Sequence, residues 1–288
     1  MIRFSVSLAF IVLFSLLITT LPASASETVQ AQVAQIFRSL GYDEVFRSFG
    51  PAIALGVTAT EERPEVVRQL RKATEQSFEP ESIFARIVER TSAALAPDAT
   101  RAVSDFYESP FGRKVAALER SVIQNGMSAA APDADTEGAD DMQRALEALP
   151  AAEGSAPKRF ALYRRLIGAI YAEPRLNEFA NAILTATLTG VVAGDPGAAG
   201  ALDAMVQSGT EAMRPLLKQI YEQLGLLYAH DTFATLELDE LERLVKMLET
   251  PEFAAFYGAL NNAMTTVMGE DSLGFGERLG AVLRANPI

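Results

Sequence analysis

Side chains with catalytic chemistry are few in this sequence, and they form no recognisable catalytic set. The chain of 288 residues has one histidine and no cysteine, which excludes a thiolate nucleophile, a disulfide and a thiolate metal site. The histidine, His230, is followed directly by Asp231, a neighbour that cannot orient its ring as a catalytic triad requires. We expect His230 to lie at a helix end and interact with the helix dipole. We therefore assign no catalytic residue and expect no enzyme, although a scattered carboxylate pair stays an alternative.

An acidic segment resembles the start of a calcium-binding loop. Asp133, Asp135 and Glu137 place oxygen ligands at the first, third and fifth positions, a glycine follows at the sixth, and Asp141 occupies the ninth. The twelfth position is Arg144, where such a loop needs a glutamate that binds the ion through both oxygens. The segment is therefore only a weak calcium candidate, and we interpret it as a solvated linker. We expect no metal and no other cofactor.

The charge balance argues against one class of partner. The chain carries 25 Lys and Arg residues against 37 Asp and Glu residues, which gives a formal charge of -12. A sequence-independent grip on phosphates comes from clustered Lys and Arg. We therefore expect neither a nucleic acid nor an anionic lipid surface as a partner.

The first 25 residues have the pattern of a secretory signal peptide. Arg3 precedes an apolar stretch at 8–21, and Ala23-Ser24-Ala25 forms a small-x-small cleavage pattern. The alternative is a retained anchor, because the apolar stretch 4–21 approaches the length that spans a bilayer. We expect cleavage after Ala25, a periplasmic or secreted location and a mature chain that is not embedded in a membrane.

Hydrophobic periodicity predicts an all-α fold. Apolar residues recur at helical spacing in most of the chain, and no run of alternating β-branched residues indicates a strand. Two stretches rich in Gly, Pro and acidic residues, 131–138 and 190–200, are predicted to be connectors. The helices are predicted at 27–40, 64–76, 83–95, 98–108, 111–127, 139–149, 158–172, 175–189, 211–227, 238–248 and 252–268.

The two halves of the chain contain a similar corner between helices, at a constant offset of 141 residues. Ser109-Pro110 in the first half corresponds to Thr250-Pro251 in the second. In each pair the hydroxyl can cap the following helix, and the proline suits its first turn. We infer a multi-helix bundle of two related halves by internal duplication, with chance similarity as the alternative. The expected divisions are a signal peptide at 1–25, a first half at 26–130, a linker region with a short helix at 131–157, and a second half at 158–288.

The first corner carries a motif that resembles a known family. Residues 106–114 read FYESPFGRK, which is similar to the hallmark of the exported bacterial family called domain of unknown function 2059. The resemblance covers about 80–125, with a weaker echo at 236–268, centred on 247–251, that lacks the aromatic pair and the Gly-Arg-Lys. It implies a helical, envelope-exposed protein of unestablished biochemical function, and it carries over no catalytic residue.

The residues of that corner have two interpretations. Phe106 and Tyr107 are spaced to pack one helix against the next, and we favour this structural role. Arg113 and Lys114 are expected on a solvated face. The alternative is an interaction surface formed by all four residues, since exposed aromatics beside Arg are typical of binding surfaces.

These observations favour a non-catalytic binding or structural module of the bacterial envelope. The partner is unknown, and we expect a protein of the envelope rather than a small molecule. The alternatives are an α-helical carrier that holds an apolar small molecule between the two halves, and an enzyme with a carboxylate-based site.

The signal peptide yields a direct prediction. The mature N-terminus should be Ser26, because the cleavage pattern ends at Ala25 and a polar helix start follows. Intact mass spectrometry of the native protein measures this end. A mass that includes Met1 would contradict cleavage and indicate a membrane-tethered chain.

Overall fold

The computed structural model describes residues 23–59, 61–129, 156–171, 173–200 and 225–286, and every regular element in these ranges is helical. The prediction of an all-α, multi-helix fold is therefore confirmed. Residues 225–233 are helical, and η2 (Pro196–Ala198) is a short 3₁₀ turn. The α-helices are α2 (Ala23–Leu40), α3 (Tyr42–Thr58), α4 (Pro64–Ser77), α5 (Pro80–Ala93), α6 (Pro97–Glu108), α7 (Pro110–Ala129), α9 (Ala156–Tyr171), α10 (Glu173–Gly194), α12 (Leu238–Leu248) and α13 (Pro251–Ala285).

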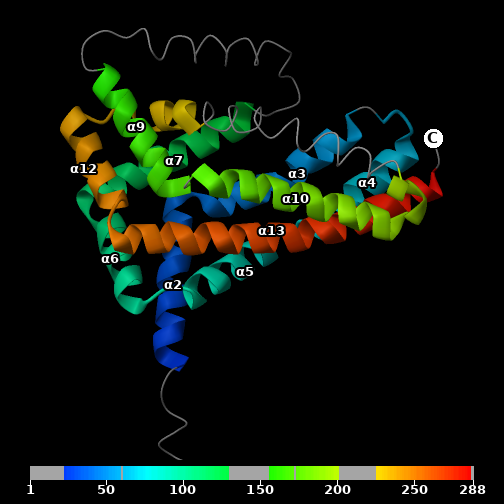
Figure 1. The fold of residues 1–288 in the computed structure, drawn as a ribbon, viewed down its shortest axis with the longest axis horizontal. Helices are drawn as coiled ribbons and strands as arrows, with labels where there is room; N and C mark the ends of the chain where they lie inside the picture. The colour runs from blue at the N-terminus through cyan, green and yellow to red at the C-terminus, as the bar shows by residue number, and fades with distance from the viewer. Residues whose placement is uncertain (1–22, 60, 130–155, 172, 201–224, 287–288) are drawn as a thin grey trace, which may run out of the picture.

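Helix α13 is the longest element and the axis of the fold. It runs across the molecule in Figure 1 and contacts α4, α5, α6, α9, α10 and α12. Because neighbours surround it, its buried residues do not form a single stripe. Buried side chains include Phe253, Phe256, Leu260 and Phe275. A helix with apolar residues on several faces belongs in the interior of a protein.

Helices α10 and α13 lie side by side and run in the same direction, with their backbones in close contact. A Cβ atom added at Gly276 would lie 2.1 Å from the carbonyl oxygen of Thr187, and one at Gly280 would lie 2.3 Å from that of Val191. Gly190 shows the same constraint, at 2.2 Å from the carbonyl oxygen of Leu273. Glycine is therefore required at this contact, since any larger residue would push the helices apart.

Ion pairs connect α5 to the middle of α13. Arg86 donates to both carboxylate oxygens of Asp271, with the bond to Oδ1 measuring 2.6 Å. Arg90 donates to Glu270 at 2.7 Å. Hydrogen bonds between charged groups are stronger than those between neutral groups, and these pairs help to hold α5 against α13.

One hydrophobic core includes residues from both halves. The ring of Phe37 on α2 lies 6.0 Å from that of Phe256 on α13, and the ring of Phe106 on α6 lies 5.3 Å from that of Phe253. Aromatic pairs at this separation add stabilisation beyond their buried area. The halves therefore share their packing.

The two similar corners have the same order of helices. Helix α6 ends at Glu108 and α7 begins at Pro110, while α12 ends at Leu248 and α13 begins at Pro251. The common origin of the halves remains a proposal that rests on this order and on the sequence offset.

The two corners differ in their caps. The amide of Gly112 donates to Ser109 Oγ at 3.0 Å, as expected of a cap. The expectation of a cap from Thr250 was wrong, because its hydroxyl instead donates to the carbonyl of Met247 at 2.9 Å.

Three further differences from the sequence expectations concern helix boundaries. Helix α3 was not anticipated, because Gly50 and Pro51 interrupt its pattern. The stretch 190–194 was predicted to be part of a connector but continues α10, since its glycines serve the contact with α13. Helix α13 runs on to Ala285, well beyond the predicted end at 268. The expected helix at 139–149 and most of that at 211–227 lie outside the described residues.

Within the ranges described above, no helix combines the length and the apolar character that a membrane span needs. Residues 1–22 lie outside these ranges. The expected cleavage after Ala25 falls in the first turn of α2, so the buried Val29 and the rest of the helix would stay in the mature chain.

The backbone contact between α10 and α13 predicts a contrast between two glycines of one helix. Gly276→Ala should destabilise the protein by about 1 to 3 kcal/mol, because overpacking forces the helices to shift. The matched control is Gly269→Ala, whose added Cβ would meet nothing within 4 Å. The control should be neutral or stabilise by up to about 1 kcal/mol. Urea unfolding measures both, and equal stabilities for the two variants would contradict the proposed contact.

Candidate functional site

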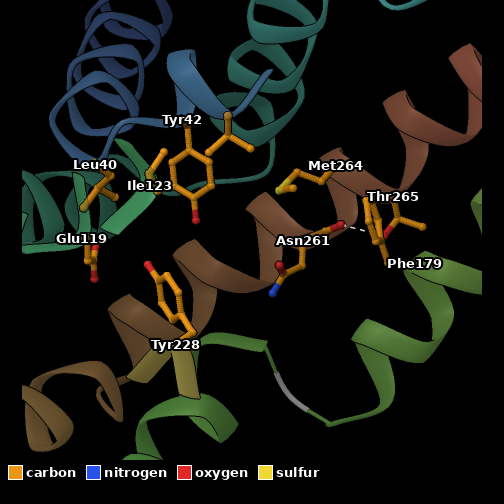
Figure 2. A pocket seen from close by; sticks show the side chains of 10 residues that line it. Leu40, Tyr42, Glu119, Ile123, Phe179, Tyr228, Asn261, Met264 and Thr265 are labelled. Carbon is orange, nitrogen blue, oxygen red and sulfur yellow. Dashed lines mark hydrogen bonds between the residues drawn. The ribbon is translucent and has the colours of Figure 1, made fainter. Parts of the chain in front are cut away.

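A cavity of about 240 Å³ lies where the two halves meet (Figure 2). The first half contributes residues of α2, α3 and α7 to its wall. The second half contributes residues of α10, the helical stretch 225–233 and α13. Most of the wall is apolar, with a few polar groups among the lining residues Leu40, Tyr42, Val45, Glu119, Ile123, Phe179, Tyr228, Asn261, Met264 and Thr265.

Glu119 is the unusual residue in this wall. Its exposed fraction is 8%, and it makes no hydrogen bond or ion pair with any residue that the structure describes. Burial raises the pKa of its carboxyl from the ordinary value of 4.5 to about 8, because an apolar surrounding disfavours the charged form. At neutral pH the cavity therefore contains an uncharged carboxylic acid.

A pair of buried tyrosines lies close to Glu119. The hydroxyls of Tyr107 on α6 and Tyr257 on α13 are 2.8 Å apart and hydrogen-bonded to each other. Burial raises the pKa of both hydroxyls, and the negative charge that Glu119 carries when ionised adds to that rise. Both tyrosines are therefore neutral near pH 7, and no cation among the described residues offsets a charge on Glu119.

Polar oxygen atoms gather on one side of the cavity. In Figure 2 the side chains of Glu119, Tyr42 and Tyr228 lie on the side of Leu40 and Ile123, across from Phe179. Tyr42 is carried by α3, directly after the left-handed turn at Gly41 that redirects the chain from α2.

The facing wall comes from α13. Asn261 donates its amide N–H to the carbonyl of Ile170 at 2.8 Å, which ties α13 to the end of α9 and leaves the amide oxygen as an acceptor. Thr265 donates to the carbonyl of Asn261 at 2.9 Å. Its hydroxyl is therefore satisfied within its own helix.

A wider groove adjoins the cavity. It has a volume of about 940 Å³ and runs along α3 and the end of α4. Val45, Ile123 and Tyr228 line both hollows. The cavity is therefore next to a surface depression rather than sealed in the core.

The motif residues of the first corner lie at a different place, where α6 and α7 meet α12 and α13. Phe106 and Tyr107 are buried, with exposed fractions of 8% and 4%, as the packing interpretation expects. Lys114 is exposed and donates to Glu240 of α12 at 2.7 Å. Arg113 is exposed and donates to the backbone carbonyl of Glu108. Of the four residues considered as an interaction surface, only Arg113 and Lys114 are accessible.

The same corner joins the two halves. Phe106 contacts Phe253, Lys114 pairs with Glu240, and the guanidinium of Arg243 lies 3.6 Å from the ring centroid of Phe111. Close approach of α6 and α7 depends on Gly112, where an added Cβ would lie 1.8 Å from the carbonyl oxygen of Phe106. The motif residues therefore build the joint against which the second half packs.

The other candidates from the sequence add no second site. Asp133, Asp135, Glu137 and Asp141, the weak calcium candidate, lie outside the described residues. In the part of the chain that is described, no group of acidic residues and histidine has the arrangement of a metal site.

His230 lies in the last turn of the helical stretch 225–233. Asp231 does contact its ring, with Oδ1 3.1 Å from Nδ1. Their side chains are 45% and 63% exposed, unlike the buried carboxylate that orients a catalytic histidine.

Sequence reasoning missed Glu119, although one signal was present. Val115 and Ala116 are buried on the same face of α7, and Glu119 follows at helical spacing, so a carboxylate occupies an apolar position. The position 141 residues later is Leu260, which is 1% exposed. An apolar residue is therefore accommodated at the corresponding place in the second corner.

The raised pKa of Glu119 predicts how stability varies with pH. Some carboxyls have a higher pKa in the folded state than in the unfolded state. The contribution of such a group to the free energy of unfolding is fully present below the unfolded pKa, and it is lost as the pH rises toward the folded pKa. Relative to Glu119→Gln, the parent should lose about 1.4 kcal/mol of unfolding free energy per pH unit between about pH 5 and pH 7.5. Urea unfolding across this range tests it, with exposed Glu89→Gln as the control. Parallel pH profiles for the parent and Glu119→Gln would contradict the buried neutral carboxyl.

Comparison with known proteins confirms the family resemblance over part of the chain. A family described as "Uncharacterized protein conserved in bacteria (DUF2059)" matches residues 81–136. Within the described residues, this range holds most of α5 and all of α6 and α7, and so includes the corner motif and Glu119. No curated protein and no solved structure showed a significant match. The matched segment is therefore similar to an uncharacterised bacterial family.

Proposed function

We propose that this protein binds a small, largely apolar molecule in the cavity between its two halves, without acting on it as an enzyme. The observation that carries this proposal is the cavity itself, which is lined from both halves and contains a buried carboxyl with no partner among the described residues. A largely apolar pocket with a few convergent polar groups is the usual form of a small-molecule site.

The size of the cavity limits the ligand. A cavity of about 150 Å³ with apolar walls is large enough to hold benzene. At about 240 Å³, this cavity suits a single ring with a short side chain, or an aliphatic chain of similar volume. The adjoining groove offers a route from solvent, since the two hollows share Val45, Ile123 and Tyr228.

The energetic cost of burying the Glu119 carboxyl in the folded protein supports a binding role. An unpaired buried polar group destabilises a protein by about 1 to 3 kcal/mol. Residues with strongly shifted pKa values concentrate at functional sites, and Leu260 shows that an apolar residue is accommodated at the corresponding corner. The presence of a carboxyl at this buried position is therefore better explained by ligand binding than by a role in packing.

The location of this activity is proposed from the sequence. The signal-peptide pattern that ends at Ala25 supports binding in the periplasm or outside the cell. Phe106 and Tyr107 form half of the surface suggested for a protein partner in the envelope. Both are buried, which weighs against such a partner.

Two neighbouring threonines of α13 provide the test. Thr265 lines the cavity, whereas Thr266 is exposed, and each donates to the carbonyl four residues before it at 2.9 Å. Thr265→Phe should fill the cavity and abolish ligand binding, while Thr266→Phe should leave it unchanged. The full chain is purified from its native host, and native mass spectrometry followed by organic extraction identifies what is bound.

The expected result is a small molecule that accompanies the parent and Thr266→Phe but not Thr265→Phe. Ligand retained by a folded Thr265→Phe would place binding elsewhere. If the parent carries no ligand, uptake of two small aromatic probes, 2-phenylethanol and 2-phenylethylammonium, is measured by calorimetry on the same three proteins. Failure of the parent to bind either probe would contradict the proposed function.

A further inference from the structure

The polar groups around the cavity favour one chemical class of ligand. Glu119 offers carboxyl oxygens, and Asn261 offers an amide oxygen, which accepts hydrogen bonds. One N–H of the same amide is bonded to the carbonyl of Ile170. None of the described residues in the wall is a Lys, Arg or His. An anionic ligand would meet no positive charge in the described part of the wall and would be repelled when Glu119 ionises.

Aromatic rings in the wall also favour a cationic ligand. Tyr42, Tyr228 and Phe179 line the cavity, and the faces of such rings carry partial negative charge that attracts organic cations. The attraction is stronger where water is excluded. The wall therefore combines a carboxyl, an amide acceptor and three rings, all of which interact favourably with a positively charged nitrogen.

We propose that the ligand is an organic ammonium ion, with its N–H groups bonded to the Glu119 carboxylate and its apolar part in the ring-lined cavity. The proposal rests on the proposed function, because it names the class of molecule that the same cavity binds. It explains why Glu119 has no counter-charge among the described residues: the ligand supplies it.

Binding of such an ion moves a proton. In the ligand-free protein Glu119 is protonated at pH 7 because burial raises its pKa to about 8. An alkylammonium has a pKa near that of lysine, about 10.4, so it keeps its proton, and the proton of Glu119 leaves to solvent. Among the described residues, the titratable groups that face Glu119 are Tyr42 from α3, Tyr107 from α6, Tyr228 from the helix at 225–233 and Tyr257 from α13. Burial raises the pKa of Tyr107 and Tyr257, so both are neutral at pH 7.

The release of a proton on binding determines how the affinity for the ligand changes with pH. Affinity for an ammonium ion should rise about tenfold per pH unit up to pH 8, because each binding event below that pH releases one proton. A neutral ligand that accepts a hydrogen bond from the protonated carboxyl should show the opposite trend. Its affinity should be constant below pH 8 and fall above it.

A matched pair of probes tests the proposal on the full chain. 2-Phenylethylammonium and 2-phenylethanol have nearly the same size and differ in charge. Calorimetry at pH 6, 7 and 8, in two buffers with different ionisation enthalpies, measures affinity and proton release together. We expect the ammonium ion to bind at least tenfold more tightly than the alcohol at pH 8, with about one proton released at pH 6 to 7.

The variant Glu119→Gln isolates the carboxyl. It should weaken ammonium binding at least tenfold at pH 8 and remove both its pH dependence and its proton release. Its alcohol binding should persist, which shows that the cavity is intact. Alcohol binding as tight as ammonium binding at pH 8, or ammonium binding that Glu119→Gln leaves unchanged, would overturn the ammonium proposal alone. Failure of both probes to bind the parent would overturn it together with the proposed function.

Discussion

The close contact between the backbones of α10 and α13 is the constraint on which the rest of the architecture depends. Gly190, Gly276 and Gly280 let the two helices approach until backbone meets backbone. The same contact fixes the direction of α13, on which α4, α5, α6, α9 and α12 then pack. A shift of this pair would move the second corner relative to the first, since Phe253 at the start of α13 contacts Phe106.

The cavity follows from where this contact ends. Nearer the N-terminal ends of the two helices, larger residues take the place of the glycines. These residues are Phe179 on α10 and Asn261, Met264 and Thr265 on α13. Thr265 precedes Gly276 by about 16 Å along the helix, at 1.5 Å per residue. The hollow lies beside these residues, and α2, α3 and α7 line it from the first half. Close packing through glycine and the lining of the cavity therefore lie at different heights along the same helix pair.

Much of the fold could be predicted from sequence, for physical reasons that also explain the failures. Helices such as α4 and α12 have one apolar stripe and a proline or acidic start, so that local pattern and tertiary packing agree. Helix α3 and the second part of α13 were missed because glycine and Pro51 disfavour a helix locally, and only contacts with other helices offset that cost. Gly50, for example, lies against the backbone of Phe78.

The candidate site was harder to predict than the fold. The conspicuous sequence motif at 106–114 forms the joint between the halves, whereas the cavity is assembled from single residues of several helices. Glu119 lies on the buried face of α7 and is recognisable as a charge at an apolar position, but its neighbours Tyr228 and Asn261 are more than 100 residues away. No short-range pattern connects them.

The Glu119 carboxyl is neutral at pH 7 because it is buried in the cavity, where no described residue supplies a counter-charge. Titration of the Glu119 side-chain carbon by ¹³C NMR, in the ligand-free full chain, measures this directly. We predict a midpoint near pH 8, in line with the raised pKa of this carboxyl. A midpoint near 4.5, the ordinary value for a glutamate, would show that the carboxyl is solvated or paired, and would contradict the account.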